Sequence, residues 1–140
     1  MYVSRTELEN IQTKAPQALQ NPGKIYIRGN YLFVNERQQG VHIINNSNPA
    51  QPQKLAFVQI PGNIDIAVKG NFLYADNGPD LLVLDIGNPE QVQLKRRIRD
   101  AFPPQVHPEQ TNVYFECVDV QRGIVIGWEN TLLTGAECFR

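Results

Sequence analysis

Hydrophobic and polar residues alternate along most of this chain, and the alternating segments come in two matching sets. Residues 29–34, GNYLFV, return about 41 residues later as residues 70–75, GNFLYA. Past a loop that is one residue shorter, residues 41–45 match residues 81–85. A period of about 40 residues made of short strands is typical of the blades of a β-propeller. The chain is therefore expected to contain two copies of one sheet-forming unit.

Each copy is predicted to fold as four short antiparallel strands, the composition of one propeller blade. The Gly29-Asn30 pair is typical of the two-residue turn of a β-hairpin. Proline cannot donate a hydrogen bond to a ladder, so Asn48-Pro49 and its counterpart Asn88-Pro89 mark the connection between the third and fourth strands. Two blades leave sheet edges unprotected, because closed propellers typically have 4 to 8.

The two ends of the chain do not follow the repeat. Ser4 and Glu7 have the spacing of a capping box, which predicts a short helix within residues 4–12, followed by an extended connector. Residues 113–120 and 124–133 are expected to form one long hairpin. The predicted fold class is thus all-β: two four-stranded propeller-type blades, a terminal hairpin and a short N-terminal helix. The expected boundaries are 1–23, 24–63, 64–103 and 104–140.

The third strand of the second copy reads Leu81-Leu82-Val83-Leu84-Asp85, and the first copy carries a degenerate version at residues 41–45. This motif resembles that of bacterial proteins built from LVIVD repeats. Residues 60–71 and 123–129 resemble the N-terminal part of the longer lipoprotein members. The resemblance implies a propeller-like fold and a place in the bacterial cell envelope, in the periplasm or at the outer membrane surface. It implies no catalytic residue, because the motif is structural.

The composition narrows the classes of partner. The formal net charge of −1 provides no broad positive field, so nucleic-acid binding is not expected. No apolar run approaches the roughly 20 residues of a membrane-spanning helix, and the N-terminus lacks the pattern of a signal peptide. Membrane association would then depend on a lipid anchor that is absent from this chain.

The two cysteines, Cys117 and Cys138, lie close enough in sequence to close a loop of about 20 residues. In an oxidising compartment they would form a disulfide. Two unpaired thiols are the alternative, and the sequence leaves this choice open.

Three aspartates raise the question of a ligand in the centre of a propeller. Asp65, Asp76 and Asp85 would bind a cation or sugar hydroxyls if they converged on a central channel. Residues 76–80 also gather oxygen ligands as a calcium loop does, but they lack the distal Glu and the glycine spacing of an EF-hand. A polar turn between two strands explains these residues equally simply, so no metal or cofactor is predicted.

The remaining candidates have structural explanations of their own. Trp128, with Tyr114 and Phe115, would form a sugar-stacking platform or merely pack the predicted hairpin. His42 is expected to face solvent or to pair across strands, and neither His42 nor His107 has a second ligand at zinc spacing. The cations of residues 95–99 are expected to protect an exposed outer strand from aggregation.

The sequence as a whole predicts a protein that is not an enzyme and has no cofactor. The expected function is a protein-interaction or scaffold module of an envelope protein, which pairs its free sheet edges with a partner or with another copy. Carbohydrate or small-ligand binding is the alternative. A hydrolase would require acid and base groups such as Asp76 and Asp85, or His42, to converge.

Overall fold

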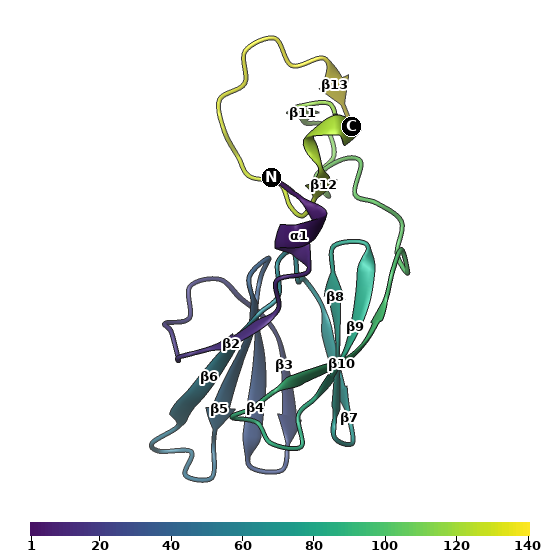
Figure 1. The fold of residues 1–140 in the computed structure, drawn as a ribbon. Coiled ribbons are helices and arrows are strands. Elements are labelled where there is room, and N and C mark those ends of the chain that lie inside the picture. The colour runs from purple at the N-terminus through teal and green to yellow at the C-terminus, as the bar shows by residue number, and fades with distance from the viewer.

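The structure is a computed structural model that describes all residues from 1 to 140. The first repeat forms an antiparallel sheet with the strand order β2-β6-β5-β4-β3 (Figure 1). Four of these strands come from the repeat itself: β3 (Pro22–Arg28), β4 (Tyr31–Glu36), β5 (Gly40–Asn45) and β6 (Gln53–Gln59). The fifth, β2 (Gln12–Lys14), comes from the N-terminal segment and pairs with β6.

The second repeat forms its own antiparallel sheet with the order β10-β9-β8-β7. Its strands are β7 (Ile66–Lys69), β8 (Phe72–Asn77), β9 (Asp80–Asp85) and β10 (Gln93–Ile98). The first strands of the two repeats, β3 and β7, lie next to each other (Figure 1). The expected all-β fold with four-stranded repeats is confirmed.

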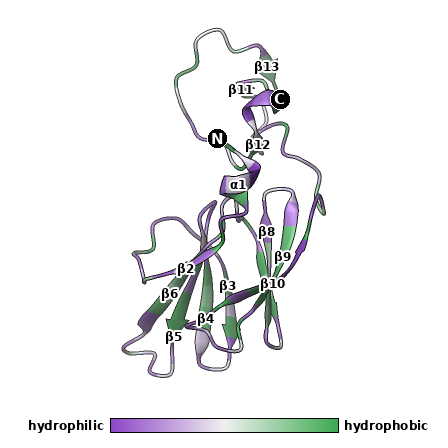
Figure 2. Ribbon diagram, viewed as in Figure 1, coloured by the Kyte–Doolittle hydropathy of each residue, from purple (hydrophilic) through white to green (hydrophobic).

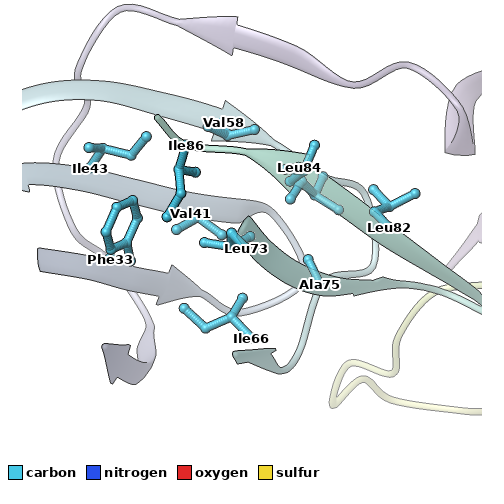
Figure 3. Packing of buried hydrophobic residues seen from close by; sticks show 11 residues of the cluster. Phe33, Val41, Ile43, Val58, Ile66, Leu73, Ala75, Leu82, Leu84 and Ile86 are labelled. Carbon is cyan, nitrogen blue, oxygen red and sulfur yellow. The ribbon is translucent and has the colours of Figure 1, made fainter. Parts of the chain in front are cut away.

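The two sheets pack face to face through alternate residues of their strands. The packing face of repeat 1 consists of Phe33, Val41, Ile43 and Val58, each at most 3% exposed. It meets the packing face of repeat 2, formed by Ile66, Leu73, Ala75, Leu82 and Leu84 (Figure 3). Hydrophobic colouring follows these central strands (Figure 2). Each fully buried Val, Leu, Ile or Phe contributes about 1.5–3 kcal/mol relative to an exposed side chain, so this interface is the main stabilising feature.

The N-terminal segment is more structured than the sequence indicated. Ser4 and Glu7 form the predicted capping box, but α1 (Arg5–Leu8) is a single turn and not a helix over residues 4–12. No helix of the structure is long enough to cross a membrane. The expected connector is also only partly correct, because β2 within it adds to the outer edge of the first sheet. One of the sheet edges expected to be free is therefore covered by the chain itself.

The prediction of one long C-terminal hairpin is wrong. Strand β11 (Tyr114–Phe115) pairs with β13 (Cys138–Phe139), and β12 (Ile124–Val125) pairs with β1 (Tyr2–Val3) at the opposite end of the chain. The turn between the expected strands is instead a 3-10 helix, η1 (Val120–Arg122). Gly123 explains part of this outcome. A Cβ there would stand 2.5 Å from the carbonyl oxygen of Val3, so only glycine lets β1 approach.

Candidate functional site: the open face of the second repeat

The face of repeat 2 that points away from repeat 1 is apolar and uncovered. The residues that alternate with its packing face along the strands form this open face: Phe72, Tyr74, Leu81, Val83 and Ile98. They lie in cross-strand rows, in which Tyr74 is opposite Val83 and Leu81 is opposite Ile98. Phe72 is 40% exposed and Ile98 37%, while the other three are half-buried. The exposed Arg96 lies opposite Val83 on the same face, at the edge of these apolar side chains. An apolar sheet surface with a polar rim is typical of an interaction surface.

The open face has a buried counterpart inside the same molecule. At the repeat spacing, Phe33 corresponds to Tyr74 and Ile43 to Val83. Val41 is paired with Val58 as Leu81 is paired with Ile98, which extends the correspondence to the fourth strand. In repeat 1 these positions are the packing face. The same surface is therefore covered by a sheet in repeat 1 and left open in repeat 2.

The face of repeat 1 that points away from repeat 2 is partly covered by residues 15–21, here called the strap. The strap joins β2 to β3, which lie at opposite edges of the first sheet. The backbone N–H groups of Gln20 and Asn21 within it donate to the carboxylate of Glu36. Glu36 and His42 lie on the sheet face that points away from repeat 2, and both are almost completely buried. The strap thus caps part of repeat 1.

Glu36 and His42 form a buried polar pair beneath the strap. His42 Nε2 lies 2.6 Å from Glu36 Oε2, and its ring packs against Phe57 in a tilted arrangement with the ring centroids 4.9 Å apart. Burial by itself would raise the pKa of Glu36, but the hydrogen bonds from His42, Gln20 and Asn21 outweigh it and lower that pKa below its usual value. His42 therefore pairs across the sheet but does not face solvent. His42 lies beneath the strap, where its role is to hydrogen-bond Glu36 within the fold.

Asn63 joins the two repeats through a second buried polar cluster. Its Oδ1 accepts from Asn35 Nδ2 of repeat 1 at 2.6 Å. Its Nδ2 donates to Asp76 Oδ1 of repeat 2 at 2.8 Å, and that oxygen also accepts from the backbone N–H groups of Ile64 and Asp65. Burial raises the pKa of the Asp76 carboxyl despite these donors. Residues 76–80 thus work as a structural turn, with Asp76 binding backbone N–H groups.

Asp80 forms a third polar cluster, in which it has no exposed side-chain surface. Its Oδ2 accepts from Arg5 at 2.6 Å and from Arg97 at 2.7 Å, and Oδ1 accepts from the N–H of Asp100. Burial would raise the pKa of Asp80, but the Asp100 N–H and the two guanidinium groups lower it overall. Arg97 is therefore turned inward, unlike the exposed Lys95 and Arg96 beside it. The expectation that all the cations of residues 95–99 lie exposed on the outer strand is therefore only partly correct.

The three aspartates considered for a central channel do not converge. Asp65 is exposed and pairs with Lys24, while Asp76 binds the backbone of the turn before β7. Asp85 lies at the other end of β9, opposite Phe72, and accepts from the N–H of Gly87. At about 3.3 Å per residue, the four residues from Phe72 to Asp76 separate the two carboxylates by more than about 10 Å. The hydrolase arrangement of Asp76 with Asp85 therefore has no geometric support.

The C-terminal segment, residues 113–140, brings together the aromatic residues considered for sugar binding. Cys117 and Cys138 form a disulfide with a Cα–Cα distance of 5.2 Å. Phe115 packs edge-on against Trp128 at 5.3 Å, and Tyr114 packs against Phe139 at 4.9 Å. Trp128 and Tyr114 line a cavity of about 220 Å³, and the Trp128 Nε1–H is buried without an acceptor. This is the only one of the suggested ligand sites whose members lie around one cavity.

The second histidine contributes to no cluster of chemical groups. His107 Nδ1 lies 3.0 Å from the carbonyl oxygen of Pro108. The structure contains no group of three or more His, Cys, Asp or Glu side chains arranged to hold a metal ion. The described geometry offers surfaces and cavities for binding, and the polar clusters stabilise the fold.

Comparison with known proteins adds one finding. The sequence model of the LVIVD repeat matches residues 22–57 and 63–100, which together make up more than half of the chain. The first range runs from β3 into β6 and the second contains β7 to β10, so the matches follow the four strands that each repeat contributes. Neither the curated proteins nor the solved structures include a match.

Proposed function

Because this chain belongs to the LVIVD repeat family, we propose that it is a non-catalytic protein-interaction or scaffold module of a bacterial cell-envelope protein. The observation that carries the proposal is the open face of repeat 2. The same pattern of side chains is buried by a neighbouring sheet in repeat 1, so its exposure in repeat 2 favours a partner at that face. The envelope location rests on the family resemblance.

The sheet face is a better candidate for the contact than the sheet edges. The outer edge of the first sheet is occupied by β2. The free edge strand β10 carries the exposed cations Lys95 and Arg96, and charged side chains on an edge oppose the addition of another strand. Pairing through edges, as suggested by the sequence, is thus less favoured than docking on the open face.

The experiment is a comparison of complexes recovered from the cells that make the protein. Val83→Glu places a charge in the centre of the open face, and Val120→Glu is a matched control on the exposed 3-10 helix η1. We expect the wild-type and Val120→Glu chains to be recovered in one cross-linked complex of defined size, and Val83→Glu to be recovered alone. Recovery of all three chains as free monomers would contradict the proposed function.

Small-ligand or carbohydrate binding is the second candidate, favoured by the cavity beside Trp128. The cavity of about 220 Å³ is small, but its wall combines aromatic rings with polar side chains such as Glu116 and Asn130. Trp128 is the only tryptophan of the chain, so its fluorescence reports on this cavity and on a second cavity of about 760 Å³ that Trp128 also lines. A glycan panel that shifts this emission, with binding lost in Trp128→Ala but kept in Phe102→Ala, would support the candidate. A panel without any shift would remove it.

A further inference from the structure

We propose that the open face of repeat 2 docks onto repeat 1 of a second copy of this chain, head to tail, and that the strap limits this contact. The inference rests on the proposed function and names its partner. The contact would reproduce between two molecules the interface that already joins the two repeats within one molecule.

The argument starts from the equivalence of the faces. Within the chain, the packing face of repeat 1 meets the packing face of repeat 2. The open face of repeat 2 has the same residue positions as the first of these. The strap side of repeat 1 has the same positions as the second: Ile25 corresponds to Ile66 and Leu32 to Leu73. The open face and the strap side are therefore equivalent by position to two surfaces that fit each other, although Val34, His42 and Ile44 on the strap side are already buried within the single chain.

The exposure of apolar side chains on the strap side supports this complementarity. Ile25 is 58% exposed and Ile27 is 72% exposed, and both belong to β3, the edge strand that lies beside repeat 2. Their counterparts in repeat 2, Ile66 and Val68, lie in or against the core between the repeats. A second copy would bury Ile25 and Ile27 in the same way, by covering them with the open face of its repeat 2.

The strap occupies part of the space that the second copy would need. It lies over Glu36 and His42, and the counterpart of His42 is Leu82, which is buried against repeat 1. Ile25 and Ile27 remain uncovered, so docking begins at β3 and is completed when the strap moves aside. A contact between two different faces produces rings if its rotation closes and open filaments if it does not. By occupying part of the contact surface, the strap would therefore limit the growth of such filaments.

Sedimentation velocity with two face variants tests the head-to-tail geometry. Val83→Glu disables the open face and leaves the strap side intact, whereas Ile27→Glu does the reverse. We expect wild-type chains to associate as concentration rises from micromolar to millimolar, and each variant alone to stay monomeric. Mixed together, the two variants should form a 1:1 dimer and nothing larger, because each supplies the face that the other lacks. Val120→Glu should behave as wild type.

A second pair of variants tests the role of the strap. Replacing residues 15–19 by a Gly/Ser stretch of equal length loosens the strap, keeps β2 attached and leaves the Gln20 and Asn21 contacts to Glu36 in place. This variant should associate at least tenfold more tightly than wild type, and adding Val83→Glu should return it to a monomer. Circular dichroism and thermal unfolding establish that each variant is folded. If the Gly/Ser variant does not fold, the milder Leu19→Ser replaces it, with tighter association again expected.

Several outcomes would overturn the proposal. A folded strap variant that remains monomeric at millimolar concentration would exclude the second copy as partner. Association that survives in Ile27→Glu but not in Val83→Glu would indicate contact between two open faces, and failure of the mixed variants to dimerise would exclude the head-to-tail geometry. The proposed function would survive these results if the complexes from cells contain a different protein whose binding is lost in Val83→Glu. The failure of this inference and the failure of the proposed function are therefore distinguishable.

Discussion

The two repeats have the same apolar rows, but they hydrogen-bond the backbone of the segment that enters the sheet in different ways. One repeat uses a side chain that accepts, and the other uses a side chain that donates. In repeat 1, Glu36 at the end of β4 accepts hydrogen bonds from the backbone N–H groups of the segment that enters β3. Asn77 occupies the equivalent position in repeat 2, and it donates to the backbone carbonyl of Pro61 in the segment that enters β7. Each side chain anchors the entering strand, with donor and acceptor exchanged.

This difference teaches where the repeat is free to vary. The buried apolar positions must match because each sheet packs through alternate residues. The polar ends of the hairpins instead adapt to the segment that lies over them. In repeat 1 this segment is the strap, and the Glu36–His42 pair lies beneath it. In repeat 2 the end of the hairpin meets α1, and Asp80 binds Arg5 there. Substitutions at these ends should therefore act on one repeat at a time.

The largest effect is expected from Asp80→Asn, which breaks the cluster that repeat 1 lacks. The equivalent residue in repeat 1 is Gly40, which has no side chain to pair. Asp80 is fully buried and pairs with Arg97, whose side chain is only 12% exposed. Removing one partner of a buried ion pair costs about 3–5 kcal/mol because the other charge stays buried without compensation. Urea unfolding at neutral pH measures the loss.

Asp85→Asn is the matched control for this prediction. Asp85 lies on the same strand, β9, but is partly exposed and accepts from a single backbone N–H, that of Gly87. We expect it to change the free energy of unfolding by less than about 1 kcal/mol. Equal effects of the two substitutions would mean that the Asp80 cluster makes no special contribution to repeat 2.

The next effect concerns the joint between the repeats. Asn63→Ala removes the side chain that binds Asn35 of repeat 1 and Asp76 of repeat 2. We expect a loss of about 2–3 kcal/mol, because buried donors and acceptors on both sides are left unpaired. Hydrogen exchange of β4 and β8 measures whether both repeats open together. Protection lost in only one repeat would show that Asn63 does not couple them.

The sequence allowed the repeats to be predicted but not the segments that cover them. Alternation, the two Gly-Asn turns and the Asn-Pro pairs are local signals, so the four-stranded units followed from them. The pairing of β2 with β6, and of β1 with β12, joins segments far apart in the sequence, and no local pattern specifies such a partner. The strap was read as a connector for the same reason.

The polar clusters were missed for a related reason, although one signal was present. His42 interrupts an apolar position that is Leu82 in the second copy, and Glu36 introduces a charge where the second copy has the neutral Asn77. A departure from the repeat at two neighbouring strands indicates that the first copy has a different environment on that face. The open face needed the structure, because in the sequence Tyr74 and Val83 look the same as their buried counterparts Phe33 and Ile43.

Substitutions in the Glu36–His42 pair of repeat 1 test the comparison of the two repeats, with a smaller expected loss of stability. His42→Leu introduces the residue found at the equivalent position, Leu82, but leaves Glu36 buried without its ring partner. We expect a loss of about 2 kcal/mol. The double variant Glu36→Gln and His42→Leu should recover part of it, because no unpaired charge is buried and the amide oxygen still accepts from one of the two strap N–H groups. Thermal unfolding of the single and double variants measures the coupling.

An absence of recovery in the double variant would contradict this account. It would mean that His42 contributes through its packing against Phe57, and that the charge of Glu36 is unimportant. The outcome thus decides whether the polar pair or the ring stabilises this part of repeat 1.

The smallest effect is the dependence of these differences on pH. The pKa values of Glu36 and Asp80 are lowered in the folded state, so their stabilising contributions are complete above the ordinary values of 4.5 and 3.8 and disappear as the pH falls below them. The pKa of Asp76 is raised, so its protonated form favours the folded state and partly offsets this loss in acid. Urea unfolding between neutral pH and pH about 3 should therefore show the gap between wild type and Asp80→Asn narrowing as the carboxylate of the wild type becomes protonated. The hydrogen bond from Asn63 lowers the pKa of Asp76, so its loss in Asn63→Ala raises that pKa further and the gap for this variant should also narrow in acid. A gap for Asp80→Asn that is equally large at both pH values would mean that the charge of Asp80, which repeat 1 does without, is not what stabilises repeat 2.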